Sequence, residues 1–300
     1  MTRPQDNPPL AAGLILLATA FIAVTTLLAK AIGTGVFGPP LHPLQVSHGR
    51  FVFAFLAIAG AMAVLRPQFA RPAWGLHIGR TTFGWLGVSL MFAAVAFLPL
   101  SDATALVFLN PIFGMVLAIP LLGEKVGPVR WSAAAIAFVG AVILLRPSAA
   151  TFQPAALLAI LGALSMGIEL IFIKRLTNRE RPAQILFFNN LIGVGIASVA
   201  VVAVWIAPTP GQWAALAGIG LAMACAQACF INGMARADAS FVAPFSYATL
   251  IFATLYDFGV FAVIPDAVSV VGAGTILAGA LLLALREGRR GKPPVPPVAR

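Results

Sequence analysis

The amino-acid sequence predicts an all-α integral membrane protein, with ten transmembrane helices arranged as two inverted five-helix repeats around a central cavity. The composition, the run of apolar segments and the distribution of positive charge support this prediction. Of the 300 residues, 60% are hydrophobic and 9% are charged. Because a soluble domain carries about a quarter charged residues, this chain lacks the polar side chains that a water-facing surface needs.

Ten apolar segments are long enough to cross a bilayer, since a membrane helix needs roughly 20 apolar residues to span a core of about 30 Å. Several of the connections between them have only a few residues, so sequential neighbours are antiparallel and no soluble domain is expected. The predicted segments are 10–31, 44–65, 80–98, 102–122, 128–146, 154–175, 183–206, 212–234, 240–263 and 267–286.

Lysine and arginine gather in alternate connections, as the positive-inside rule predicts for a membrane protein. Of the 19 Lys and Arg residues, only Lys30 and Arg146 fall on the poorer side, and Arg50 falls inside a span. The richer side includes Arg80 and both chain ends, so we expect both termini in the cytoplasm. No cleaved signal peptide is expected, since no basic cluster precedes the first apolar run. The net charge of +10 comes without a basic stripe bearing aromatics, so we expect no nucleic-acid partner.

The two halves of the chain resemble each other. The stretch "DATALVFLNP" at 102 lines up with "DASFVAPFSY" at 238, and Pro43 and Gln45 match Pro182 and Gln184. With five helices each, the halves enter the bilayer from opposite sides, an arrangement used for alternating access around a midplane site. The expected units are residues 1–148, residues 149–290 and a disordered cytoplasmic tail at 291–300.

Ionisable side chains inside the predicted spans are costly in lipid, so each is a functional candidate unless it fastens the fold. Arg50 lies about two turns from the outer end of the second predicted helix. We expect it to pair with Asp257 or Asp102, as a gate or a structural ion pair, or else to bind a substrate carboxylate. Glu169 is poorly aligned with Lys174, five residues on. It is either the partner of an interfacial basic residue or a cavity carboxylate that holds a substrate ammonium or a coupling proton.

Neutral polar residues mark the fourth and ninth predicted helices. Proline removes a backbone donor and frees a carbonyl one turn earlier, so Asn110 and Pro111 predict a kink near mid-depth. Ser246 and Tyr247 align with them in the second half. Two related irregular helices favour a binding site, and a purely structural kink is the alternative. The candidate substrate-binding residues are Phe108, Asn110, Pro111, Met166, Glu169, Asn189, Gln227, Ser246 and Tyr247.

Three motifs resemble those of the drug/metabolite transporter superfamily, in its EamA-type ten-helix exporters and close to the YddG-type amino-acid exporters. They are "GRFVFAFL" in the second predicted helix, "LNPIFGMVLAIPLLGEKV" in the fourth and "APFSYATLIFATLYDFGVF" in the ninth. The resemblance covers essentially the whole chain and implies a pathway lined by helices one to four and six to nine. This chain has Ala262 and Val263 where the family shows Gly-Glu, so the second-half counterpart of Glu124 is absent.

The resemblance implies a secondary transporter that moves small organic metabolites, above all amino acids, by alternating access and in the direction of export. A flippase or scramblase for lipids or other amphipathic substrates, built on the same fold, is the alternative. The sequence has no Walker, H-E-x-x-H or G-x-S-x-G motif, so we expect no enzyme, no cofactor and no metal. The expected partners are a small-molecule substrate and the lipid bilayer of a bacterial inner membrane, and a monomer is compatible with the sequence.

Overall fold

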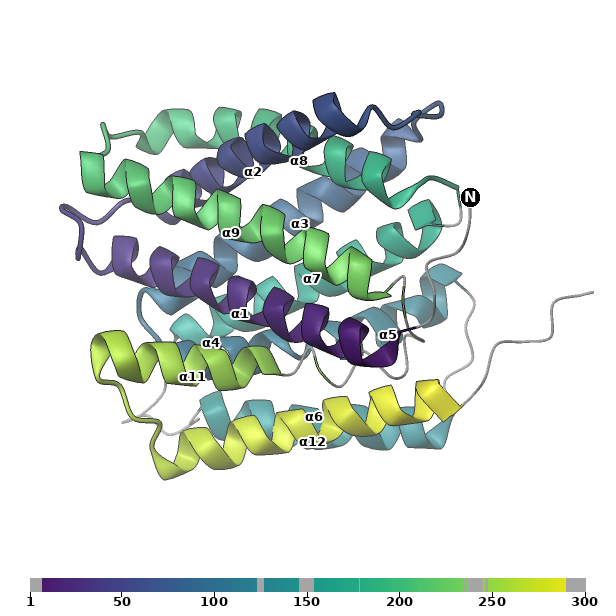
Figure 1. The fold of residues 1–300 in the computed structure, drawn as a ribbon. Helices are drawn as coiled ribbons and strands as arrows, with labels where there is room; N and C mark the ends of the chain where they lie inside the picture. The colour runs from purple at the N-terminus through teal and green to yellow at the C-terminus, as the bar shows by residue number, and fades with distance from the viewer. Residues whose placement is uncertain are drawn as a thin grey trace, which may run out of the picture.

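The computed structural model describes residues 7–122, 127–145, 154–177, 179–234, 236, 245 and 248–289, and its regular structure in these ranges is helical. The helices lie side by side in one bundle (Figure 1). They are α1 (Pro8–Gly33), α2 (Pro43–Leu65), α3 (Trp74–Val95), α4 (Leu100–Val107), α5 (Asn110–Leu122), α6 (Pro128–Leu145), α7 (Ala155–Thr177), α8 (Pro182–Val201), η1 (Val202–Val204), α9 (Pro210–Met234), α11 (Ala248–Phe261) and α12 (Ala267–Arg289).

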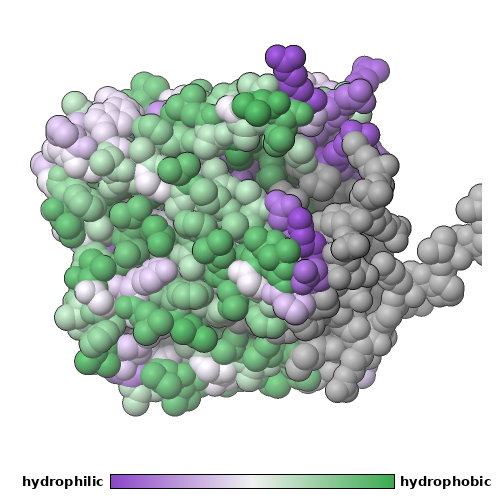
Figure 2. Space-filling model, viewed as in Figure 1, coloured by the Kyte–Doolittle hydropathy of each residue, from purple (hydrophilic) through white to green (hydrophobic). Residues whose placement is uncertain are grey.

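Seven helical stretches in this part of the chain are long and apolar enough to cross a membrane, and three shorter helices are apolar. The shorter ones fall in α6, α11 and α12, where the sequence predicts spans, so the full count of ten stays a prediction. Apolar side chains cover most of the visible face, while hydrophilic ones gather near the end where α1 begins (Figure 2). The placement of the termini and the tail at 291–300 lie outside the described residues.

Proline begins five of the described helices, at Pro8, Pro43, Pro128, Pro182 and Pro210. Proline suits the first helical position, because its fixed φ matches the helix and its missing N–H would have no partner there. We call the end of the bundle where α1, α3 and α8 begin the inner end. The opposite end, where α2, α4 and α9 begin, is the outer end.

The helix contacts of the two halves match. When each helix is replaced by its counterpart in the other half, an observed contact becomes another observed contact. Helix α1 packs on α9 as α7 packs on α3, α2 packs on α9 as α8 packs on α3, and α5 packs on α7 as α11 packs on α1. Helices α6 and α12 pack on each other and lie along one edge of the bundle (Figure 1). This pattern is the one expected of two repeats related by a two-fold axis.

Glycines let α7 approach its neighbours closely. A Cβ atom added to Gly84 of α3 would lie 2.8 Å from the carboxyl carbon of Glu169, and one added to Gly87 would lie 2.7 Å from Met166 Cγ. On the other side of α7, a Cβ atom on Gly167 would lie 2.9 Å from the backbone nitrogen of α5 residue 114. Helix α7 is therefore packed tightly between α3 and α5, with Glu169 and Met166 against α3.

The fourth predicted helix is broken where the proline predicts a kink. Phe108 and Leu109 separate α4 from α5, and Leu109 N donates to Leu106 O at 3.1 Å. This i to i−3 bond tightens the chain into a 3₁₀ turn directly before Asn110 and Pro111. The predicted irregularity at these residues is confirmed.

Helix α3 begins at Trp74, well before the predicted start at residue 80. Arg80, which the charge pattern places in a cytoplasmic connection, therefore lies within the helix and is only 8% exposed. That assignment was wrong because an arginine interrupts the apolar pattern from which the helix start is inferred. The buried position makes Arg80 part of the bundle interior.

Candidate functional site

Three charged residues from three helices meet inside the bundle, and we call them the arginine cluster: Arg50 of α2, Arg80 of α3 and Glu169 of α7. Arg80 Nε lies 3.4 Å from Glu169 Oε1, an ion pair without hydrogen-bond geometry. Arg80 Nη1 donates to Ile185 O of α8 at 3.2 Å. Arg80 thus ties α3 to two helices of the other half.

Arg50 is almost fully buried, with 5% of its surface exposed. Its Nε and Nη1 atoms have no hydrogen-bond partner among the described residues. The guanidinium carbon lies 4.5 Å from the centroid of the Phe51 ring, a contact of about 0.5 to 2 kcal/mol. A buried charged donor without a partner costs more than about 1 to 3 kcal/mol. The aromatic contact alone therefore does not offset the burial of this charge.

Glu169 faces Arg80, and 19% of its side-chain surface is accessible to water. Arg50 lies close enough to interact electrostatically with both Glu169 and Arg80. Two guanidinium groups thus share one carboxylate, which is itself partly exposed.

A band of neutral polar side chains continues from the arginine cluster. Asn189 Oδ1 accepts a hydrogen bond from Thr81 Oγ1 at 3.3 Å, and Asn190 Nδ2 donates to Gln227 Oε1 at 3.5 Å. Asn190 Oδ1 and Trp85 Nε1 are buried without a partner among the described residues. The interior between α3, α8 and α9 therefore offers donors and acceptors to a polar ligand.

Asn110 and Met166, both predicted as site residues, lie next to each other. Asn110 Nδ2 is 4.0 Å from Met166 Sδ, and Met166 lies about one turn from Glu169 on α7. Phe108, at the end of α4, is partly buried and packs against the hydrophobic core. The structure thus brings Asn110, Met166 and Glu169 together. The remaining candidates lie outside what the structure describes: the Pro111 side chain, Ser246 and Tyr247.

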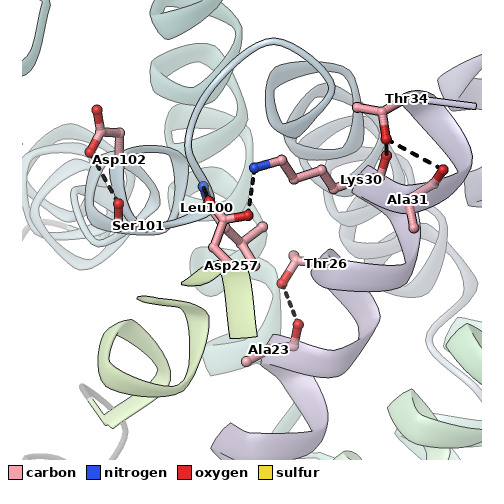
Figure 3. A network of polar contacts seen from close by, with 9 residues as sticks. All are labelled: Ala23, Thr26, Lys30, Ala31, Thr34, Leu100, Ser101, Asp102 and Asp257. Atoms are coloured by element: carbon pink, nitrogen blue, oxygen red, sulfur yellow. Dashed lines mark hydrogen bonds and ion pairs between the residues drawn. The ribbon is translucent and has the colours of Figure 1, made fainter. Parts of the chain in front are cut away.

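Asp257 pairs with Lys30, so the predicted pairing of Arg50 with Asp257 is wrong. Lys30 Nζ of α1 lies 2.5 Å from Asp257 Oδ1 of α11, and both side chains are buried. Leu100 N, at the start of α4, donates to Asp257 Oδ2 at 2.8 Å (Figure 3). The lysine stem also brings Nζ to 4.8 Å from the Phe261 ring centroid. Lys30 reaches Asp257 because α1 packs directly on α11.

Asp102 is likewise not paired with Arg50. Ser269 Oγ of α12 donates to Asp102 Oδ2 at 2.8 Å, and Ser101 Oγ donates to Oδ1 at 3.2 Å. These bonds tie the first turn of α4 to α12 at the outer end. Both carboxylates that the sequence offers as partners for Arg50 are therefore engaged elsewhere.

At the inner end, Glu180 bridges the two halves through three short contacts. It accepts a hydrogen bond from Ala73 N at 2.7 Å, while its other oxygen lies 2.7 Å from both His77 Nε2 and Gln184 Nε2. Burial by itself would raise the pKa of Glu180, but these hydrogen bonds and the charge of His77 outweigh it and lower the pKa. Sequence reasoning missed Glu180 and His77, and the match between Gln45 and Gln184 was the one available signal.

Two cavities lie away from the arginine cluster. One of about 410 Å³ opens at the outer end among α1, α2 and α3, and its lining includes Ala29, Leu41 and Phe92. The other, of about 350 Å³, lies mostly between α11 and α12 and is lined largely by apolar side chains such as Leu250 and Val270. Neither offers charged groups, so the polar interior around the arginine cluster is the stronger candidate for a metabolite site.

The comparisons with known proteins point to one family. The model of the EamA-like transporter family matches the chain twice, over residues 9–146 and 153–285. A riboflavin transporter of Rhizobium johnstonii is 36% identical over 222 residues, which are 73% of this chain and 72% of that protein. An S-adenosylmethionine uptake transporter of Rickettsia bellii is 25% identical over 278 residues, covering 92% of this chain and 93% of that protein.

A pseudopaline exporter of Pseudomonas aeruginosa is 23% identical over 214 residues, covering 71% of this chain and 75% of that protein. A protein of known crystal structure is 20% identical, with a TM-score of 0.62 over 93% of this chain and 99% of the other, and shows the same fold. Amino-acid export, the narrower expectation from the motifs, finds no support among these relatives.

Proposed function

Since the chain belongs to the EamA-like transporter family and is a membrane transporter of small metabolites, we propose that it takes up a heteroaromatic metabolite of the riboflavin or S-adenosylmethionine type. The bound cargo lies against the arginine cluster and the polar band beside it. The observation that carries the proposal is this polar, partly unpaired interior. Buried unpaired polar groups cost free energy, and apolar packing of the bundle does not require them.

The unpaired groups suit a ring system with several donors and acceptors. Trp85 Nε1 and Asn190 Oδ1 are buried, and neither has a hydrogen-bond partner among the described residues. Leaving such groups unpaired is costly, and a ligand that pairs with them recovers that cost. A pocket with a few convergent polar groups between helices is the usual form of a metabolite site.

We propose that the cargo crosses by alternating access between two inverted repeats, residues 1–148 and 149–290. The matched packing of α1 on α9 and α7 on α3 supports this arrangement, as does the double match to the family model. In such transporters the site lies between the repeats, and the two halves rock around it. The arginine cluster meets this condition because Arg50 and Arg80 come from one half and Glu169 from the other.

Transport into proteoliposomes tests the proposal. Purified protein is reconstituted, and entry of labelled riboflavin, S-adenosylmethionine and a panel of amino acids is compared with that in empty liposomes. Saturable entry of riboflavin or S-adenosylmethionine is expected. Entry of amino acids alone would replace the proposed cargo, and translocation of fluorescent lipid without any of these solutes would support the flippase alternative.

A further inference from the structure

We propose that Arg50 binds an anionic oxygen group of the cargo, either a carboxylate or a phosphate. The inference rests on the proposed transport function and adds the chemical class of group that the site selects, so that cargo bearing a carboxylate or phosphate binds more tightly than riboflavin, which bears neither. It begins from the fact that this guanidinium, 5% exposed, has two donor atoms with no partner among the described residues. An arginine stays charged in any protein environment, so it cannot escape burial by losing its proton.

The three described carboxylates considered as partners of Arg50 are each engaged by another group. Asp257 holds Lys30 at 2.5 Å and accepts from Leu100 N. Asp102 accepts from Ser269 at 2.8 Å. Glu169 forms its ion pair with Arg80 at 3.4 Å and also interacts electrostatically with Arg50. Among the described residues, one carboxylate thus serves two guanidinium groups, and Arg50 has no direct ion pair of its own.

The charge balance of the arginine cluster points to an anion. Arg50 and Arg80 bring two positive charges, and Glu169 brings one negative charge. In an interior of low dielectric, an uncompensated charge strongly attracts an opposite one. A neutral cargo could satisfy a donor of Arg50, but only an oxyanion satisfies the donor and balances the charge. Guanidinium groups bind carboxylate and phosphate through charge-assisted hydrogen bonds, often in pairs.

The position of the cluster fits a group on a transport path. Arg50 lies on α2 of the first half, and Glu169, with which it interacts electrostatically, lies on α7 of the second half with 19% of its side chain exposed. Phe51, which lies under the guanidinium, packs against Gly193 of α8, where a Cβ atom would collide with the ring. Arg50 is thus held at the contact between the halves, and movement of one half against the other changes its access.

The test compares cargo with and without an oxyanion group. The probes are riboflavin 5′-phosphate against riboflavin, and S-adenosylmethionine against decarboxylated S-adenosylmethionine, which lacks the carboxylate but keeps the ammonium and the sulfonium. Binding to wild type, Arg50→Gln and Arg50→Lys in nanodiscs is measured by calorimetry, and uptake by each variant is measured in proteoliposomes. The matched control is Arg66→Gln, because Arg66 directly follows the same helix and is exposed.

We expect Arg50→Gln to weaken binding of at least one oxyanion-bearing probe tenfold or more, with its counterpart that lacks the oxyanion unchanged, and Arg50→Lys to fall between. The phosphate and carboxylate arms identify which oxyanion is bound. Equal loss for both members of each probe pair, or no loss, would overturn the inference. So would preference of the wild type for the member without the oxyanion in both pairs. If Arg50→Gln fails to fold, Arg50→Lys and the wild-type preference decide.

The two levels of the account fail in different ways. If wild type transports probes with and without the oxyanion equally well, the proposed function holds and the proposed role of Arg50 is wrong. If wild type neither binds nor transports any of the four probes, the proposed cargo is wrong as well. Thermal unfolding of each variant shows that a change in binding is not a loss of fold.

Discussion

Gln45 and Gln184 make the same two-bond clamp at opposite ends of the bundle, each on the backbone of the other half. Gln45 Nε2 donates to Ile206 O at 2.6 Å, and Ile206 N donates back to Oε1 at 3.3 Å. Gln184 Nε2 donates to Ala70 O at 3.1 Å, and Ala70 N donates back to Oε1 at 2.7 Å. Each glutamine lies in the first turn of a helix, α2 or α8, that begins with proline.

The paired clamps predict opposite effects of two alanine substitutions. Gln45→Ala removes the outer clamp, and Gln184→Ala removes the inner clamp together with the hydrogen bond to Glu180, at a cost of about 1 kcal/mol for each hydrogen bond. A weaker inner clamp favours states open at the inner end, and a weaker outer clamp favours the reverse. Reagent access to the interior, measured from each side of reconstituted vesicles, checks the prediction. A shift toward the same side in both variants would contradict it.

Glu180 predicts a loss of stability in acid. Its pKa is lowered from the ordinary value of 4.5, because the hydrogen bonds from Ala73, His77 and Gln184 outweigh burial. A lowered carboxyl pKa contributes stability that is present above the ordinary pKa and is lost as the pH falls through the folded-state value. Thermal unfolding in detergent is compared for wild type and Glu180→Gln between neutral pH and pH values below 4.5. Wild type should unfold at a higher temperature than Glu180→Gln at neutral pH, and this difference should shrink in acid. A difference that does not change with pH would show that the ionised Glu180 carboxylate is not responsible for it.

The buried pair of Lys30 and Asp257 predicts a strong coupling between two substitutions. Asp257→Asn alone leaves the Lys30 ammonium buried without its carboxylate, which costs about 3 to 5 kcal/mol. Replacing both partners, Lys30→Met with Asp257→Asn, removes the stranded charge and should recover much of this loss. Chemical unfolding of the two single variants and the double variant measures the coupling. Simple addition of the single effects would show that the two side chains do not interact.

Gly84 predicts a link between helix packing and the arginine cluster. Gly84→Ala places a methyl group 2.8 Å from the Glu169 carboxyl carbon, so the Glu169 carboxyl group must shift and its contact with Arg80 changes. A misfit of this kind costs about 1 to 3 kcal/mol. Gly75→Ala is the matched control, because it lies on the same helix with nothing within 4 Å. We expect lower thermal stability and weaker cargo binding for Gly84→Ala only; equal behaviour of the two variants would contradict the close contact.

Most helix positions could be predicted because burial in lipid demands long apolar runs. The predicted segment 44–65 and the observed α2, Pro43–Leu65, differ by one residue at the start. Helix α3 was misplaced because Arg80 and His77 interrupt its first turns, and their partners, Glu169 and Glu180, lie far along the chain. When a charged residue in a helix pairs with a residue far along the chain, the local sequence alone assigns it to a loop.

Side-chain partners could not be predicted at the same level. The sequence places Arg50 and Asp257 at similar depth, but depth leaves the rotation of each helix about its axis open. Only the packing of α1 on α11 shows that Lys30, and not Arg50, reaches Asp257. The break at Asn110 was predictable because proline acts locally on its own helix.

Access to one interior position from both faces of the membrane tests alternating access most directly. Cys225 and Cys229 are free, so replacing both by serine and introducing Met166→Cys leaves a single reporter beside Glu169. A membrane-impermeant thiol reagent is applied to reconstituted protein from either side, with and without cargo. The account predicts labelling from each side, slowed by bound cargo. Labelling from one side only, or from neither, would contradict it.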